Sequence, residues 1–247
     1  MTEVHRWTAR DGVELAYREI GTGRPLLLLH GFFTTADHAW IRSGHAERLA
    51  ARGHRVVMPD LRAHGDSAKP HDPTAYPPDV LADDALELVE RLGLTDHDLA
   101  GYSLGARTVV RMLARGATPR RAVVGGAGFE QLLDPRGRGK RFRRVLEGLG
   151  THEWGSPDWL AEGFLRKVKG DPVALLHLLE TPAASTREEL AAIEVPTLVI
   201  EGDRDDPESG RRLAELLPHG TATVVPGDHF SASGTPELVA AMADFLD

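Results

Sequence analysis

The residues best suited to chemistry lie in Gly101-Tyr102-Ser103-Leu104-Gly105, which fits the pattern G-x-S-x-G. A short apolar run precedes it and a helix-forming stretch follows, which is the setting in which this pattern presents a nucleophilic serine. Small residues flank the serine because a strained strand-to-helix turn leaves no room for larger side chains. The following helix would point its positive end at the serine. We therefore predict that Ser103 is a nucleophile, and the alternative is a glycine-lined turn with an ordinary surface serine.

A serine hydroxyl needs a base that accepts its proton, and neutral imidazole suits this task because it titrates near neutral pH. The chain has twelve histidines. His229 follows the last predicted strand and precedes the last predicted helix, and loops at the carboxyl ends of parallel strands build active sites. We predict that His229 is the base. His30 and His64 each precede a glycine, and we interpret them as turn-stabilising residues near the site.

The third group of such a site is a carboxylate that orients the imidazole and stabilises its charged form. The loop after the penultimate predicted strand offers three candidates, Asp203, Asp205 and Asp206. We favour Asp205, because a turn that begins at Gly202 should direct its fourth residue inward, and Asp206 is the second choice. The resulting order of nucleophile, acid and base along the chain differs from the orders of the two best-known serine protease families.

The elements that must position these residues follow from the alternation of short apolar runs with longer amphipathic stretches. Strands are predicted at residues 26–29, 56–58, 99–100, 122–124, 197–200 and 223–225, after an antiparallel ribbon at 8–17. Helices are predicted at residues 36–51, 79–92, 104–115, 209–217 and 236–246, the last capped by Thr235. This alternation predicts an α/β fold with a mostly parallel sheet.

The domain organisation follows from where the alternation stops. A chain of 247 residues is long enough for one large α/β domain. Residues 129–190 read instead as several short helices broken by glycine and proline. We therefore predict a core formed by residues 1–128 and 191–247, with residues 129–190 inserted as a helical lid.

Composition excludes several classes of function. The net charge of −8, from 29 basic and 37 acidic residues, argues against a nucleic-acid partner. The absence of cysteine excludes thiolate chemistry and disulfides, and no zinc or nucleotide motif is present, so we expect no metal and no cofactor. No signal segment or membrane-length apolar run is found, which predicts a cytoplasmic protein without a membrane partner. The oligomeric state is left open.

Two groups of residues in the predicted lid allow two interpretations each. A basic run could attract anionic substrates or solvate the outer surface, and we favour the second; it consists of Arg136, Arg138, Lys140, Arg141, Arg143 and Arg144. Aromatic side chains could line an acyl pocket or pack a small core; they are Phe142, Trp154, Trp159 and Phe164.

Together with the serine motif, two further segments resemble the α/β-hydrolase family over nearly the whole chain. Leu29-His30-Gly31-Phe32 is similar to the H-G-x turn of that family, and residues 59–67 are similar to its D-x-R-G-H-G-x-S segment. The resemblance implies an eight-stranded sheet flanked by helices, and an oxyanion hole formed by the backbone N–H groups of Phe32 and Leu104. Branches of the family that act on epoxides or carbon–halogen bonds carry aspartate at the position of the motif serine, so Ser103 argues against those reactions.

Three positions depart from the usual family pattern, namely Ala63, Ala106 and Asp228, where glycine is common. None of them removes a reactive group, although Asp228 could raise the pKa of His229 if the two lie close.

The expected function is hydrolysis of a small carboxylic ester or related acyl substrate by Ser103, His229 and Asp205 through an acyl-enzyme. Carbon–carbon bond hydrolysis, lactone hydrolysis and cofactor-free perhydrolysis use the same groups and remain alternatives. A non-catalytic ligand receptor on the same fold is the alternative from a different class.

Overall fold

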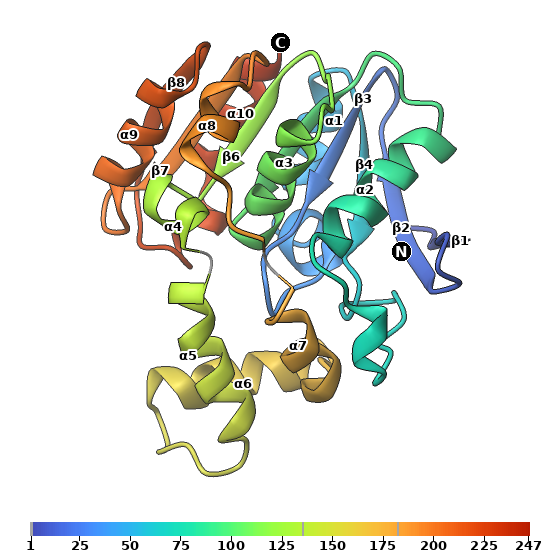
Figure 1. Ribbon diagram of the computed structural model, residues 1–247, viewed down its shortest axis with the longest axis vertical. Coiled ribbons are helices and arrows are strands. Elements are labelled where there is room, and N and C mark those ends of the chain that lie inside the picture. Colours follow the sequence, from blue (N-terminus) through green and yellow to red (C-terminus); the bar gives the residue numbers. More distant parts are fainter. Residues whose placement is uncertain (1, 135, 182) are drawn as a thin grey trace.

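The computed structural model describes residues 2–134, 136–181 and 183–247, and within them an eight-stranded sheet forms the centre of the molecule (Figure 1). The strands are β1 (His5–Thr8), β2 (Glu14–Ile20), β3 (Arg24–Leu29), β4 (His54–Asp60), β5 (Asp98–Tyr102), β6 (Ala122–Gly125), β7 (Thr197–Gly202) and β8 (Gly220–Val225). They lie in the order β1-β2-β4-β3-β5-β6-β7-β8. β2 pairs antiparallel with both β1 and β4, and the other neighbours are parallel. The predicted fold class is therefore confirmed.

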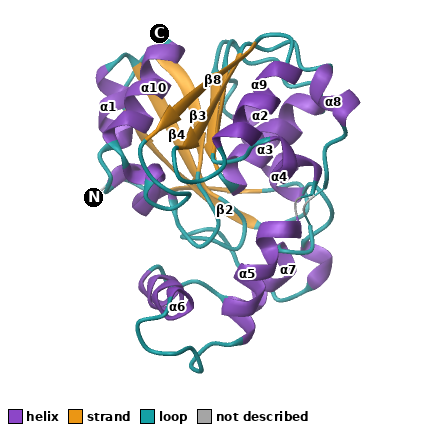
Figure 2. Ribbon diagram, turned by 90° about the vertical axis from the view of Figure 1, so that its left-hand side faces the viewer, coloured by secondary structure: helices purple, strands orange, loops and turns teal. Residues whose placement is uncertain are grey.

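Helices cover both faces of the sheet, so the central strands are buried on both sides (Figure 2). In β3, Leu26 and Leu28 pack into the core beneath α1 (His45–Ala51) and α10 (Pro236–Leu246). Leu27 and Leu29 point the other way, into the core beneath α2 (Val80–Arg91), α3 (Leu104–Ala114) and α9 (Pro207–Leu216). This double burial explains why β3 reads as a continuous apolar run rather than as an alternating one.

The prediction of a single helix over residues 36–51 is wrong. A π-helical turn, Asp37–Ile41, is followed by a break, and α1 begins only at His45. Gly44 has φ 75°, a left-handed conformation that no right-handed helix contains and that glycine adopts without steric cost. The other predicted helices agree with the structure to within two residues, and α10 begins at Pro236 as predicted.

The chain between β6 and β7 forms α4 (Phe129–Leu133), α5 (Arg136–Glu147), α6 (Pro157–Lys167), α7 (Pro172–Leu178) and α8 (Arg187–Ala191). The first and last of these lie against the core: the Glu130 N–H donates to Ser209 Oγ at 3.2 Å, and Arg111 Nη1 donates to Glu189 Oε2 at 3.0 Å. Helices α5, α6 and α7 project beyond one end of the sheet in both views (Figures 1 and 2). We call these three the lid helices, and the lid boundaries at 129 and 190 stay a prediction.

A buried ion pair fixes the segment after β4. Arg62 is almost completely buried, and its guanidinium donates to both oxygens of Asp84 at 2.8 and 3.0 Å. The same side chain donates to Asp11 and to the Ala75 carbonyl, each at 2.6 Å. Arg62 thereby connects the loop after β4 to α2 and to the turn between β1 and β2.

We predict that Arg62→Ala lowers the free energy of unfolding by about 3–5 kcal/mol, because it leaves the buried Asp84 carboxylate without its partner. Arg211 provides the control, since its pair with Glu208 is exposed on both sides, and Arg211→Ala should leave stability unchanged. Urea unfolding of both variants measures the difference. Equal effects of the two substitutions would contradict the role assigned to Arg62.

Candidate active site

Ser103 occupies the turn between β5 and α3 in a strained backbone conformation. Its φ and ψ are 55° and −109°, which a residue with a Cβ adopts only when its surroundings hold it there. Part of that support is a hydrogen bond of 2.7 Å from the Ser103 N–H to the Gly125 carbonyl at the end of β6. The hydroxyl is thereby presented at the N-terminus of α3, where the helix dipole favours negative charge.

The two glycines of the motif are required by space. A Cβ on Gly101 would lie 2.4 Å from the carbonyl carbon of Gly105. A Cβ on Gly105 would lie 2.2 Å from the Leu29 carbonyl oxygen in β3. Both distances are far below van der Waals contact, so only glycine lets the first turn of α3 lie this close to β3 and β5.

This packing predicts opposite effects for one substitution at two helical glycines. Gly105→Ala should destabilise the protein by about 3 kcal/mol or more, because the new methyl group meets rigid backbone. Gly163 in α6 has open space around its Cβ position, so Gly163→Ala should stabilise by up to about 1 kcal/mol through helix propensity alone. Thermal or urea unfolding of the two variants checks both signs. A neutral Gly105→Ala protein would be incompatible with the close approach.

The structure brings together the three residues predicted from the sequence. Ser103 Oγ lies 2.9 Å from His229 Nε2, and His229 Nδ1 lies 2.8 Å from Asp205 Oδ2. The His229 and Asp205 side chains are 13% and 11% exposed, so both are largely shielded from water. The arrangement has the geometry of a nucleophile, a base and a carboxylate that orients the base.

Each of the three neighbouring aspartates has a different partner. The Asp205 N–H donates to the Gly202 carbonyl at 3.1 Å, which closes the turn and directs the side chain toward His229. Asp203 accepts a hydrogen bond from the Gly227 N–H at 2.8 Å. Asp206 caps α9 by accepting from the Ser209 N–H at 3.1 Å.

Tyr102 is a site residue that the sequence analysis did not single out. Its hydroxyl donates to the His229 carbonyl at 2.8 Å and so holds the backbone of the loop that carries the imidazole. The ring fits against Gly125 and Gly126, where an added Cβ would lie 2.8 Å from ring atoms. The glycine-rich segment after β6 therefore makes room for this tyrosine, and the only signal in the sequence was the position of Tyr102 beside the motif serine.

The loop of His229 is also held from within. The Asp228 carboxylate accepts hydrogen bonds from the Ser231 and Phe230 N–H groups at 2.8 and 3.1 Å. These bonds, that of Ser231 foremost, lower the pKa of Asp228. The effect of Asp228 on His229 stays a prediction.

His30 and His64 have structural hydrogen bonds. His30 Nδ1 donates to the Gly31 carbonyl at 2.8 Å, and its Nε2 accepts from the Leu61 N–H at 3.0 Å. His64 Nδ1 donates to the Arg62 carbonyl at 3.0 Å. Burial lowers the pKa of His30 and lowers that of His64 to about 3, so both rings are neutral near pH 7. His30 connects the loop after β3 to the loop after β4, and the His64 ring packs edge-on against the His30 ring with ring centres 5.1 Å apart.

The two predicted oxyanion donors flank the serine. Leu104 is the first residue of α3, so its N–H has no acceptor within the helix. Phe32 follows Gly31, whose Cβ position lies 3.5 Å from the Ser103 Cβ, and both Phe32 and Ser103 line the same cavity. Their role in binding an oxyanion stays a prediction.

A cavity of about 530 Å³ opens above Ser103 and His229. Its walls are mainly apolar and include Phe32, Trp40, Phe142 and Phe164. Two of the lid aromatics therefore contribute to the cavity. The other two, Trp154 and Trp159, pack against each other with ring centres 5.7 Å apart, and Trp154 is 82% exposed.

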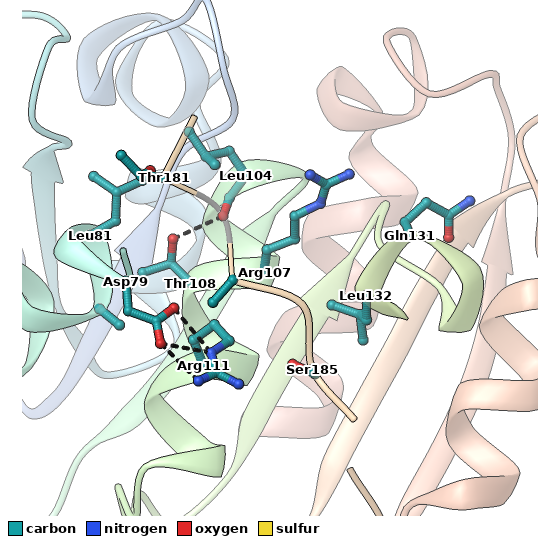
Figure 3. Close-up of a pocket in the computed structure, with 12 residues that line it drawn as sticks. Asp79, Leu81, Leu104, Arg107, Thr108, Arg111, Gln131, Leu132, Thr181 and Ser185 are labelled. Atoms are coloured by element: carbon teal, nitrogen blue, oxygen red, sulfur yellow. Dashed lines mark hydrogen bonds and ion pairs between the residues drawn. The ribbon is translucent and has the colours of Figure 1, made fainter. Parts of the chain in front are cut away.

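A second, smaller pocket of about 40 Å³ lies beside α3 (Figure 3). Asp79 and Arg111 face each other in it at 2.7 Å, and Arg111 also pairs with Glu189. Ser103 and His229 do not line this pocket. Its charged pair stabilises the contact between α2, α3 and α8.

Neither a metal-binding cluster nor a membrane-spanning helix occurs among the described residues. No group of three or more histidine, aspartate or glutamate side chains there is arranged to hold a metal ion. None of the described helices is long and apolar enough to cross a membrane.

A sequence model of the alpha/beta hydrolase family matches residues 26–242. The chain belongs to this family. It is 28% identical over 262 residues to the non-heme chloroperoxidase CPO-A1 of Kitasatospora aureofaciens, with 93% of each chain covered.

Solved alpha/beta hydrolase structures are similar over the whole chain. A hydrolase from Pseudomonas aeruginosa PA01 has a TM-score of 0.81 at 24% identity, covering 99% of this chain and 98% of the other, which shows the shared fold. A thermophilic esterase from Thermogutta terrifontis has a TM-score of 0.74 at 26% identity, with 99% and 98% covered.

Proposed function

We propose that this alpha/beta hydrolase cleaves carboxylic esters through an acyl-enzyme on Ser103. The observation that carries the proposal is the continuous chain of hydrogen bonds from Ser103 through His229 to Asp205 at the base of an apolar cavity. An apolar cavity suits an acyl chain, and the hydrogen-bonded chain suits activation of a hydroxyl nucleophile. The resemblance to a thermophilic esterase at 26% identity adds support.

In the first half of the reaction, His229 Nε2 accepts the Ser103 proton as Oγ attacks the ester carbonyl carbon. Asp205 keeps the imidazole oriented and stabilises its positive form. The backbone N–H groups of Phe32 and Leu104 stabilise the negative charge on the former carbonyl oxygen. The tetrahedral intermediate then collapses, His229 returns the proton to the leaving alcohol, and an acyl-serine remains.

In the second half, water takes the place of the alcohol. The water oxygen attacks the acyl-serine while His229 accepts one proton from the water. His229 then returns this proton to Ser103 Oγ as the carboxylic acid leaves. The balance is one ester and one water converted into one acid and one alcohol. The chain's own residues supply every proton transfer in this sequence.

The first test uses 4-nitrophenyl esters and a fluorophosphonate that labels activated serines. Ser103→Ala should abolish labelling and lower kcat by a factor of about 10⁴ or more. Retention of full esterase activity by Ser103→Ala would refute the mechanism. Ligand binding without turnover or labelling in the unmodified protein would favour the receptor alternative.

The same chemical change at two adjacent aspartates isolates the role of Asp205 within that test. Asp205→Asn should lower kcat about 10³–10⁴-fold, because the amide cannot stabilise the protonated imidazole in the same way. Asp206→Asn should leave kcat unchanged, because asparagine caps a helix as well as aspartate does. A larger loss of kcat from Asp206→Asn than from Asp205→Asn would show that Asp206, and not Asp205, is the carboxylate that orients His229.

Perhydrolysis is the second candidate, and it is favoured by the resemblance to the non-heme chloroperoxidase. Hydrogen peroxide would replace water as the attacking group on the acyl-serine, and a peracid would replace the acid as the product. From acetic acid, Ser103 would form the acyl-enzyme with loss of water, and peroxide would then release peracetic acid. We therefore expect that, with acetate and peroxide, any peracid formed depends on Ser103. Added bromide is oxidised by the peracid to hypobromite, which brominates an indicator dye and so measures peracid formation, with Ser103→Ala as control. Peracid formation that persists in Ser103→Ala would separate it from the proposed site.

A further inference from the structure

The walls of the active-site cavity carry one permanent charge among the described residues. That charge is the guanidinium of Arg141, and the other lining side chains are apolar, hydroxyl-bearing or imidazole groups. The chain as a whole has a net charge of −8, so the charge at this position is opposite in sign to the net charge of the protein. The Arg141 side chain is 40% exposed, so water screens part of its charge, but a guanidinium at the wall of an apolar cavity still attracts a ligand of opposite charge.

The lid helix α5 holds Arg141 in place over the cavity. Arg141 and Val145 are four residues apart, on the same face of the helix, and both line the cavity. The adjacent Phe142 anchors this stretch, since its ring lies 4.9 Å from both Phe32 and Phe33.

One aromatic ring, that of Phe230, separates the guanidinium of Arg141 from His229. The guanidinium stacks 5.1 Å from the centre of the Phe230 ring, and that ring is in turn 5.4 Å from the ring of His229. Stacking on an aromatic face orients a guanidinium while leaving its N–H edge available for hydrogen bonds.

The carboxylate beside Arg141 is bound more closely by another residue. Arg144 donates to both oxygens of Asp158, at 2.7 and 3.2 Å. Arg141 reaches the same carboxylate only at 3.5 Å, and its contact with the Pro157 carbonyl is also 3.5 Å. Arg141 is thus weakly held by its protein acceptors, whereas the neighbouring basic residues Arg143 and Arg144 have closer ones.

We propose that Arg141 forms an anion subsite that selects acyl substrates bearing a carboxylate at the end remote from the ester, such as monoesters of dicarboxylic acids. The planar guanidinium matches a carboxylate, and one fixed positive charge balances one negative charge. The acyl chain then lies along the aromatic wall between Ser103 and Arg141. This assignment rests on the proposed esterase function.

The test compares two series of esters of increasing acyl-chain length. One series consists of monoethyl esters of dicarboxylic acids, and the other of ethyl esters of the matching monocarboxylic acids. Acid release is followed in a pH-stat. The measured quantity is the ratio of kcat/KM for the charged ester to that for its neutral counterpart. In the unmodified protein this ratio should peak at one chain length, the one that spans from Ser103 to Arg141. Raising the ionic strength should lower it.

Three substitutions on α5 make the test specific. Arg141→Gln should lower the ratio about tenfold or more, the loss expected for one hydrogen-bonded charge pair. Arg141→Lys should restore part of it, because the charge is kept and the planar fork is lost. Arg143→Gln should leave the ratio unchanged, because Arg143 does not line the cavity. Fluorophosphonate labelling of each variant verifies that the site is intact.

The outcomes separate this inference from the function on which it rests. Suppose that turnover depends on Ser103, but that the kcat/KM ratio of charged to neutral esters does not change with Arg141, ionic strength or chain length. This result would overturn the subsite and leave the esterase function supported. Absence of Ser103-dependent turnover or labelling with every ester would overturn the function. Calorimetric titration with free glutarate then tests the subsite directly, since binding that is unchanged in Arg141→Gln contradicts it.

Discussion

The close approach of α3 to the sheet is the constraint on which the candidate site depends. Gly105 lies so near the Leu29 carbonyl that even a methyl group would overlap it. This contact fixes the start of α3, which in turn forces Ser103 to a φ of 55°. Because the helix begins at that point, its N-terminal N–H groups and its dipole face the same space as the serine hydroxyl. The strain at Ser103, the position of its hydroxyl and the nearby positive end of α3 thus follow from one packing contact.

Hydrogen bonds among the surrounding loops hold the other groups of the site in place relative to Ser103. Tyr102, the residue before the serine, fixes the His229 loop through its hydroxyl. Buried Asp60 at the end of β4 accepts hydrogen bonds from the Ala36 and Asp66 N–H groups at 2.8 and 3.0 Å. His30 joins the same two loops from the other side. Buried polar networks with satisfied partners hold loops in one geometry, which a preorganised site requires.

The lid helices add a different kind of control. The core supplies the groups that would act on a carbonyl, whereas much of the cavity wall comes from α5 and α6, through Phe142, Val145 and Phe164. Changes in this segment would alter the shape and charge of the cavity without touching Ser103, His229 or Asp205. Fold and reacting groups can therefore be shared across a family while the preferred substrate differs.

The sequence by itself determined the fold class. It also predicted Ser103 and His229, and favoured Asp205 over Asp206, as the residues that the structure joins by hydrogen bonds. Those inferences rest on local chemistry: glycines beside a serine, buried apolar runs, and loops that follow strands. It did not foresee the break at Gly44 in the predicted helix at 36–51, because a left-handed glycine and a helical one look alike in sequence. It predicted a strand only at residues 99–100, whereas β5 begins at Asp98, because the charge of Asp98 is balanced by Arg120 at 3.1 Å, a residue distant along the chain.

Only the tertiary structure decided which side chains share a cavity. Tyr102 is a variable position of a motif until its hydroxyl is seen on the His229 carbonyl. Arg141 is one of six basic residues between positions 136 and 144 until its guanidinium is found over Phe230 at the cavity wall. The side chains of Arg136 and Arg138 in that run lie outside the described part of the structure. The physical reason is that local patterns specify elements, whereas contacts between residues far apart in the chain arise only when those elements pack.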